Sequence, residues 1–272
     1  MKLFLYIGMT ALVLTACSSR ENVSNDESEI ANAITSCDSG SSGIVNGTSV
    51  TAQDPDSKRA VLLIIHRGKI VTSCTGTPIS DRVILTAGHC LKDVKKGDVD
   101  VVFNSDISCS AMANSIPSVD ILIHKDYKGD NQAKFDLAML KLESPIPSSY
   151  LPQSIYDGKA PLSNDQVLMI GYGVTSESIH DSMHLRKTTK SFKTETAIRD
   201  QNIGFDQRTG GGVCSGDSGG PVYVQVGGEY KIIAVNSTVM NKDESQACHG
   251  LSMAMYMPFF ADWVQQSLDK LR

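Results

Sequence analysis

The sequence predicts an all-β protein built from two antiparallel β-barrels, followed by a C-terminal α-helix. Short runs rich in β-branched residues recur with turn residues between them, a rhythm typical of antiparallel strands in small barrels. The first set of runs covers 60–65, 69–73, 83–86, 99–103, 119–124 and 138–142, and the second covers 166–171, 185–194, 220–226 and 230–236. The segment 143–164 between the two sets is rich in Pro and Ser and is the expected crossing between the barrels.

The C-terminal segment 258–272 predicts an amphipathic helix. Apolar side chains recur at helical spacing on one face, at Phe260, Trp263, Val264, Leu268 and Leu271. Pro258 suits the first turn of a helix, where its missing N–H costs no hydrogen bond. This helix is therefore expected to pack its apolar face against the body of the protein.

Length and charge limit the organisation and the partners. From Ile44 onward 229 residues remain, enough for one unit with an N-terminal barrel at about 44–150 and a C-terminal barrel at about 160–257. The chain has 25 basic and 30 acidic residues. Two basic and five acidic residues lie in the first 43, so residues 44–272 have 23 basic and 25 acidic residues and a net charge of −2. This balance predicts no nucleic-acid partner.

The first 17 residues have the pattern of an export signal. Lys2 precedes an apolar run, 3–14, that is too short to span a bilayer as a stable helix. The run ends in Leu-Thr-Ala-Cys at 14–17, which resembles the bacterial lipobox and implies that Cys17 carries lipid. An ordinary cleaved signal peptide is the alternative. Either way we expect export, as an outer-membrane or cell-surface lipoprotein or as a protein released after activation.

The segment 18–43 is rich in Ser, Asn, Asp and Glu and has few apolar residues. Such a composition cannot bury enough apolar surface to fold by itself. We expect it to be a flexible tether or a pro-segment.

The most informative run in the chain is Cys-Ser-Gly-Asp-Ser-Gly-Gly-Pro at 214–221. A serine hydroxyl becomes a good nucleophile only when a base takes its proton and donors stabilise the resulting oxyanion. The glycines around Ser218 allow a tight turn that exposes the hydroxyl and directs N–H groups toward one point. Two further motifs supply the partners: Leu-Thr-Ala-Gly-His-Cys at 85–90 contains His89, and Asp136 begins the apolar run 137–142.

His89, Asp136 and Ser218 occur in the chain order of the chymotrypsin-type triad, not in the orders of subtilisin or the α/β-hydrolases. Ile-Val-Asn-Gly at 44–47, Cys-Thr-Gly-Thr at 74–77 and Gly-Tyr-Gly at 171–173 add to the match. The chain therefore resembles the chymotrypsin/trypsin family (S1 family) of serine endopeptidases over 44–272. The resemblance implies the chymotrypsin-like fold of two six-stranded barrels, a protein or peptide substrate, and no cofactor or metal.

The resemblance assigns a role to each catalytic residue. Ser218 is the nucleophile, His89 is the general base and then the general acid, and Asp136 orients the imidazole. The backbone N–H groups of Gly216 and Ser218 form the oxyanion hole.

Activation is also implied by the resemblance. Cleavage before Ile44 frees an amine that pairs with Asp217 and orders the site. The residue before this bond is Gly43, whereas the family commonly has Lys or Arg there. We therefore expect an activating protease that is not trypsin-like.

The specificity pocket is the least defined part. Where trypsin-like members carry an aspartate six residues before the nucleophile, this chain has Gly212, followed by Val213. A Lys or Arg at the substrate position P1 would be buried without a partner. Gly212, Val213 and Thr238 are the expected pocket residues and indicate an elastase-like, apolar P1 preference. The segment 252–257 is rich in Met and aligns ambiguously with the family.

Seven cysteines become six if Cys17 carries lipid, and an even count in an exported protein predicts disulfides. The family resemblance implies the pairs Cys74–Cys90 and Cys214–Cys248. Cys37 and Cys109 remain, so a bridge between them follows from counting alone. Metal binding is the alternative for the cysteines, and no Cys/His spacing supports it.

The leading functional hypothesis is a serine endopeptidase, expected to be a monomer. A second hypothesis is a catalytically silent homologue that binds a partner through the same fold. A third is a protease of very narrow specificity. The complete set of triad residues favours an active enzyme.

Overall fold

The computed structural model of the chain describes residues 44–105, 112–129, 133–160, 162–176, 183–241 and 243–272. The predicted signal and pro-segment, the predicted lipid site Cys17 and the predicted Cys37–Cys109 bridge lie outside the described residues. Within the described ranges, no helix has both the length and the apolar character that a membrane span requires.

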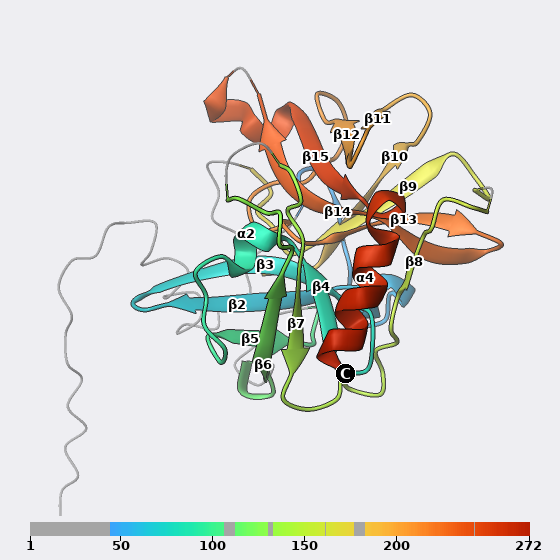
Figure 1. Cartoon of the computed structure of the whole chain (residues 1–272). Helices are drawn as coiled ribbons and strands as arrows, with labels where there is room; N and C mark the ends of the chain where they lie inside the picture. The colour runs from blue at the N-terminus through green and yellow to red at the C-terminus, as the bar shows by residue number, and fades with distance from the viewer. Residues whose placement is uncertain (1–43, 106–111, 130–132, 161, 177–182, 242) are drawn as a thin grey trace, which may run out of the picture.

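Six strands form a closed antiparallel barrel in the order β2-β3-β4-β7-β6-β5. The strands are β2 (Val61–Arg67), β3 (Ile70–Pro78), β4 (Val83–Thr86), β5 (Val99–Val102), β6 (Ile116–Ile123) and β7 (Ala138–Leu142). These strands overlap the six predicted runs, so the first predicted barrel is confirmed. In Figure 1 it is the cyan and green unit.

The second unit is a nine-stranded sheet in the order β1-β10-β9-β13-β14-β15-β12-β11, with β8 pairing to β14 in parallel. Its strands are β1 (Thr48–Ser49), β8 (Ser154–Ile155), β9 (Gln166–Gly171), β10 (Arg186–Ser191), β11 (Thr196–Arg199), β12 (Asn202–Asp206), β13 (Pro221–Val226), β14 (Glu229–Met240) and β15 (Leu251–Tyr256). With the first barrel and the C-terminal helix, this sheet completes a chymotrypsin-like fold. Figure 1 shows most of it in yellow and orange.

Five of these strands, β1, β8, β11, β12 and β15, were not among the predicted runs. Three of the four residues of β11 are exposed, and β12 turns only Ile203 and Phe205 fully inward, so neither gives a strong apolar pattern. The Met-rich segment 252–257, left unassigned from the sequence, falls mainly in β15. The strand β1 comes first in the chain but pairs with β10, so the residues after Ile44 join the second unit.

The helical elements are short except at the C-terminus. They are η1 (Pro55–Lys58), α2 (Gly88–Leu91), η2 (Glu244–His249) and α4 (Met257–Leu271). Helix α4 confirms the predicted helix and buries Phe260, Val264 and Leu271. It contacts β14 and β8, and the carbonyl of Arg272 accepts a hydrogen bond from Nζ of Lys141 on β7, so α4 spans both units.

The core explains why the first barrel and the second sheet meet where they do. Leu62 and Ile64 of β2 pack in a cluster shared with the second unit, whereas Val61, Leu63 and Ile65 fill the barrel interior. Because side chains alternate between the two faces of a strand, β2 must be apolar on both faces. The shared cluster forms the interface between the units.

Candidate active site

His89 and Asp136 come from neighbouring strand ends of the first barrel. Strands β4 and β7 pair with Thr86 opposite Ala138, which brings the start of α2 close to the residue before β7. The Nδ1 atom of His89 lies 2.7 Å from Oδ2 of Asp136, and the backbone N–H of His89 donates to Oδ1 at 2.7 Å. Asp136 is buried, while the His89 side chain is partly exposed. The imidazole is therefore fixed by a carboxylate that water scarcely reaches.

The charge of Asp136 is stabilised by hydrogen bonds. Burial acts to raise the pKa of this carboxyl, but bonds from the His89 ring, the Ser237 hydroxyl and the His89 backbone outweigh it, so the pKa is lowered from its ordinary value. Oγ of Ser237 donates to Oδ2 of Asp136 at 2.5 Å. Ser237 was not predicted as a site residue, because only the strand β14 brings it to a carboxylate 101 residues away in the sequence.

Glycines shape the turn that carries Ser218. Gly219 has φ of +80°, and a Cβ there would lie 2.0 Å from Oγ1 of Thr86 and 2.4 Å from the carbonyl oxygen of Thr75. Any other residue would therefore separate the turn from the first barrel. The N–H of Gly219 also donates to the carbonyl of Asn236 at 2.8 Å, which ties the turn to β14.

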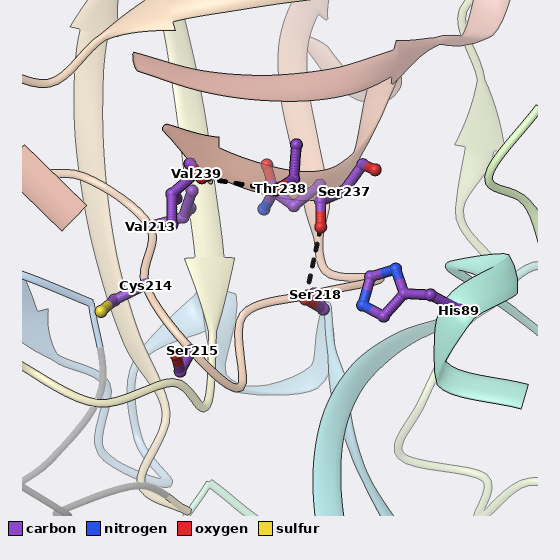
Figure 2. A pocket seen from close by; sticks show the side chains of 9 residues that line it. His89, Val213, Cys214, Ser215, Ser218, Ser237, Thr238 and Val239 are labelled. Carbon is purple, nitrogen blue, oxygen red and sulfur yellow. Dashed lines mark hydrogen bonds between the residues drawn. The ribbon is translucent and has the colours of Figure 1, made fainter. Parts of the chain in front are cut away.

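Ser218 lies beside His89 in the same cleft (Figure 2). Its hydroxyl donates to the carbonyl of Ser237 at 3.5 Å, the long hydrogen bond drawn as a dashed line, and not to the imidazole. Catalytic hydrogen bonds are often long or misaligned before substrate binds. A rotation about χ1 of Ser218 is the movement that would direct the hydroxyl toward His89.

Thr75 of β3 holds the turn from the opposite barrel. Its N–H donates to the Ser218 carbonyl at 2.8 Å, and its hydroxyl donates to the Gly216 carbonyl at 2.9 Å. The same hydroxyl accepts from the N–H of Tyr172 at 3.1 Å. Thr75 is fully buried. The Cys-Thr-Gly-Thr motif was noted in the sequence, but this positioning role required the tertiary structure.

The predicted oxyanion-hole donors are in a suitable local conformation. Gly216 has φ of +93°, a conformation that favours glycine. Its carbonyl is held by Thr75, whereas the N–H groups of Gly216 and Ser218 have no internal hydrogen-bond partner among the residues that the structure describes. Both donors therefore remain available to a substrate oxygen.

A cleft of about 220 Å³ lies next to Ser218. Two of the three predicted pocket residues, Val213 and Thr238, line it, together with Val239. The complete set of lining residues is His89, Val213, Cys214, Ser215, Ser218, Asn236, Ser237, Thr238 and Val239. Figure 2 shows Val213 and Val239 facing each other at the end of the cleft away from His89. A second hollow, of about 360 Å³, begins on the other side of His89 and Ser237.

The third predicted pocket residue, Gly212, does not line this cleft. Gly212 and Val45 form a backbone bridge, with N–H to carbonyl distances of 2.9 and 3.1 Å. A Cβ at Gly212 would lie 2.5 Å from Cδ of Gln207, so the Gln207 side chain occupies the space of a side chain at position 212. The cleft is therefore bounded by Val213 rather than by Gly212.

The predicted activation residues both lie deep in the second unit. Ile44 and Asp217 are fully buried, and Ile44 shares an apolar cluster with Val213. The carboxylate of Asp217 accepts from the N–H groups of Gly173 and Cys214 at 2.8 and 2.9 Å. Burial raises the pKa of Asp217 to about 7, although these two hydrogen bonds act to lower it.

The structure contains both disulfides implied by the resemblance, Cys74–Cys90 and Cys214–Cys248. In the described part of the chain, one group of potential metal ligands has its ligand atoms within 4.8 Å of one another: Cys74, Cys90 and His89. Because both sulfur atoms belong to a disulfide, neither is a thiolate that could bind a metal. This group therefore gives no reason to place a metal in the site.

Comparison with known proteins agrees with this geometry. The model of the Trypsin family matches residues 44–264. Trypsin of Saccharopolyspora erythraea is 26% identical over 203 residues, covering 71% of this chain and 86% of that protein. Vitamin K-dependent protein C of Rattus norvegicus is 26% identical over 214 residues, covering 71% of this chain and 45% of that protein. Ovochymase of Halocynthia roretzi is 28% identical over 169 residues, 54% of this chain and 10% of that protein.

Proposed function

The chain belongs to the trypsin family of serine proteases, and from this premise we propose that it is a working endopeptidase that forms an acyl-enzyme on Ser218. The observation that carries the proposal is the pair His89–Asp136 at 2.7 Å, next to a serine in the same cleft. The family alone would not distinguish an active enzyme from a silent homologue.

In the proposed mechanism His89 takes the proton of Ser218 as the hydroxyl attacks the substrate carbonyl. His89 then gives this proton to the leaving amine, and a water molecule attacks the acyl-enzyme in the reverse sequence. Asp136 stabilises the imidazolium that forms between these steps, and its own charge is supported by Ser237. The unoccupied N–H groups of Gly216 and Ser218 stabilise the oxyanion, at about 3 kcal/mol per donor.

The proposed P1 preference is for uncharged, small or medium-sized side chains. Val213, Val239 and Thr238 provide the walls, and apart from the catalytic His89 no titratable side chain is among the described lining residues. A Lys or Arg in this cleft would lose its hydration without gaining a counter-ion. Peptides with aliphatic P1 residues should therefore be cleaved better than Arg peptides. Preferential cleavage at Arg would refute this assignment.

We also propose that the chain is made as a zymogen, cut between Gly43 and Ile44. The buried Asp217 has no cationic partner among the described residues, so a new ammonium group at Ile44 would relieve an unfavourable buried carboxylate. The proposed export signal, with lipid on Cys17 and a tether at 18–43, would place the enzyme at a membrane surface. Cleavage before Ile44 would release the enzyme only in the absence of the predicted Cys37–Cys109 bridge, which would keep the tether attached.

The test is active-site labelling of two purified forms, one covering residues 18–272 and one beginning at Ile44. We expect a fluorophosphonate probe to add its mass to the Ile44 form, to leave the longer form largely unmodified, and to fail on Ser218→Ala. Equal labelling of both forms would refute the zymogen proposal. No labelling of either folded form would refute catalysis and favour the partner-binding homologue.

A further inference from the structure

Two buried carboxamides in the second unit differ in how their polar atoms are satisfied. Gln207 is 1% exposed, and its side chain accepts from the Val213 N–H at 2.7 Å and donates to the carbonyls of Val213 and Cys248, both at 3.0 Å. Asn236 is 2% exposed, yet neither Oδ1 nor Nδ2 has a hydrogen-bond partner in the described structure. Gln207 therefore has a structural role, whereas the burial of the Asn236 amide without hydrogen-bond partners requires another explanation.

Asn236 lies on the wall of the cleft next to Ser218. Side chains alternate along β14 from Ala234 to Asn236, before the bulge between Asn236 and Thr238, and Ala234 packs in the interior cluster of the second unit. Asn236 is therefore on the Ala234 face, and its cross-strand partner on β15 is Ala254 of the same cluster. The side chain is therefore on the inner face of the sheet, and Asn236 lines the same cleft as Val213 and Val239.

A second unsatisfied polar group lies on the same face. Ser252 of β15 is fully buried, and its Oγ has no hydrogen-bond partner. It is two residues from Ala254, so it points to the same side of the sheet, and it pairs with the cleft residue Val239. Leaving such a group unpaired costs about 1–3 kcal/mol. Of the two residues, Asn236 lines the cleft, so a ligand there that supplied its missing hydrogen bonds would recover this energy.

We propose that Asn236 recognises the P1 side chain, and that among uncharged P1 residues the pocket selects those ending in a carboxamide, Gln or Asn. The inference rests on the proposed peptidase function. A carboxamide carries both a donor and an acceptor, which match Oδ1 and Nδ2 of Asn236. Aliphatic side chains fill the same space without satisfying either atom. A site with polar groups arranged for hydrogen bonding discriminates against analogues that lack them.

The test uses fluorogenic peptides that differ only at P1, in pairs of similar size: Gln against Met, and Asn against Leu. With the form beginning at Ile44, we expect kcat/KM to be at least tenfold higher for the carboxamide member of one or both pairs. Asn236→Leu, which keeps the side-chain shape, should reduce this ratio to about one. A cooperative urea unfolding transition like that of the unmutated chain shows that the variant is folded. Ser252→Ala, the second variant, should reduce the ratio by a smaller factor.

A binding measurement separates this inference from catalysis. With Ser218→Ala, calorimetric titration should give a Kd for the Gln peptide at least fivefold below that for the Met peptide. Equal affinities, or a kcat/KM ratio near one that Asn236→Leu leaves unchanged, would overturn the role of Asn236. A retained affinity difference without fluorophosphonate labelling of the unmutated chain would support the recognition and overturn only the peptidase function.

Discussion

The buried carboxyl of Asp217 should make the stability of the uncut chain fall as the pH rises. Burial raises its pKa from 3.8 to about 7, so the folded chain binds this proton more tightly than the unfolded chain. Between these two pH values the unfolded chain has released the proton and the folded chain has kept it. Stability is therefore lost across this window, by about 4 kcal/mol at about 1.4 kcal/mol per pKa unit.

The substitution Asp217→Asn isolates this single group, because asparagine does not titrate. Urea unfolding of the 18–272 chain, in a Ser218→Ala background, would be measured from pH 4 to pH 8 with and without the substitution. The asparagine should lose the hydrogen bond from Cys214 at every pH, a constant offset. After this offset is subtracted, the free energy of unfolding of Asp217→Asn, relative to the chain with Asp217, should rise by up to about 4 kcal/mol between pH 4 and pH 8.

The same pair of variants in the form beginning at Ile44 provides the control. If the Ile44 amine reaches Asp217, the carboxylate is charged and paired, and asparagine becomes increasingly unfavourable as the pH rises toward neutrality. Opposite pH slopes for the two forms are expected. A flat difference in the uncut chain would refute the raised pKa of Asp217. The same slope in both forms would show that the amine does not pair with Asp217.

Three further substitutions test the site. Ser237→Ala removes one hydrogen bond to the Asp136 carboxylate, and kcat should fall about tenfold or more, because bonds to charged groups contribute about 1.5–3 kcal/mol; an unchanged kcat would remove Ser237 from the mechanism. Thr75→Val should lower the unfolding free energy by about 1–3 kcal/mol, because it removes the hydrogen bond that holds the turn carrying the nucleophile. The fold-decrease in kcat should exceed the fold-change in KM. Loss of stability without loss of kcat would contradict this role of Thr75. Gly219→Ala should abolish activity, whereas Gly227→Ala, also at positive φ but facing open space, should cost only about 1 kcal/mol of stability; similar effects of the two on kcat would contradict the close approach at Gly219.

Much of the catalytic centre could be predicted from the sequence because its chemistry lies in short motifs. His89, Asp136 and Ser218 each occur in a local pattern, and the structure brings His89 and Asp136 into contact and places Ser218 in the same cleft. The first barrel could also be predicted from the sequence, because strands such as β2 are apolar on both faces and give continuous apolar runs. Strand β11, mostly exposed, gave no comparable pattern.

The specificity pocket and the supports of the catalytic centre were decided only by the tertiary structure. The family resemblance placed Gly212 in the pocket, but Gly212 does not line the cleft, and the side chain of Gln207 fills the space there. The contacts of Thr75 and Ser237 and the position of Asn236 beside the cleft could not be read from local sequence, because each depends on strands far apart in the chain. The sequence thus determined which groups can react. The packing of the two units determined which backbone and side-chain atoms surround them, because hydrogen bonding and burial depend on neighbours that sequence separation does not reveal.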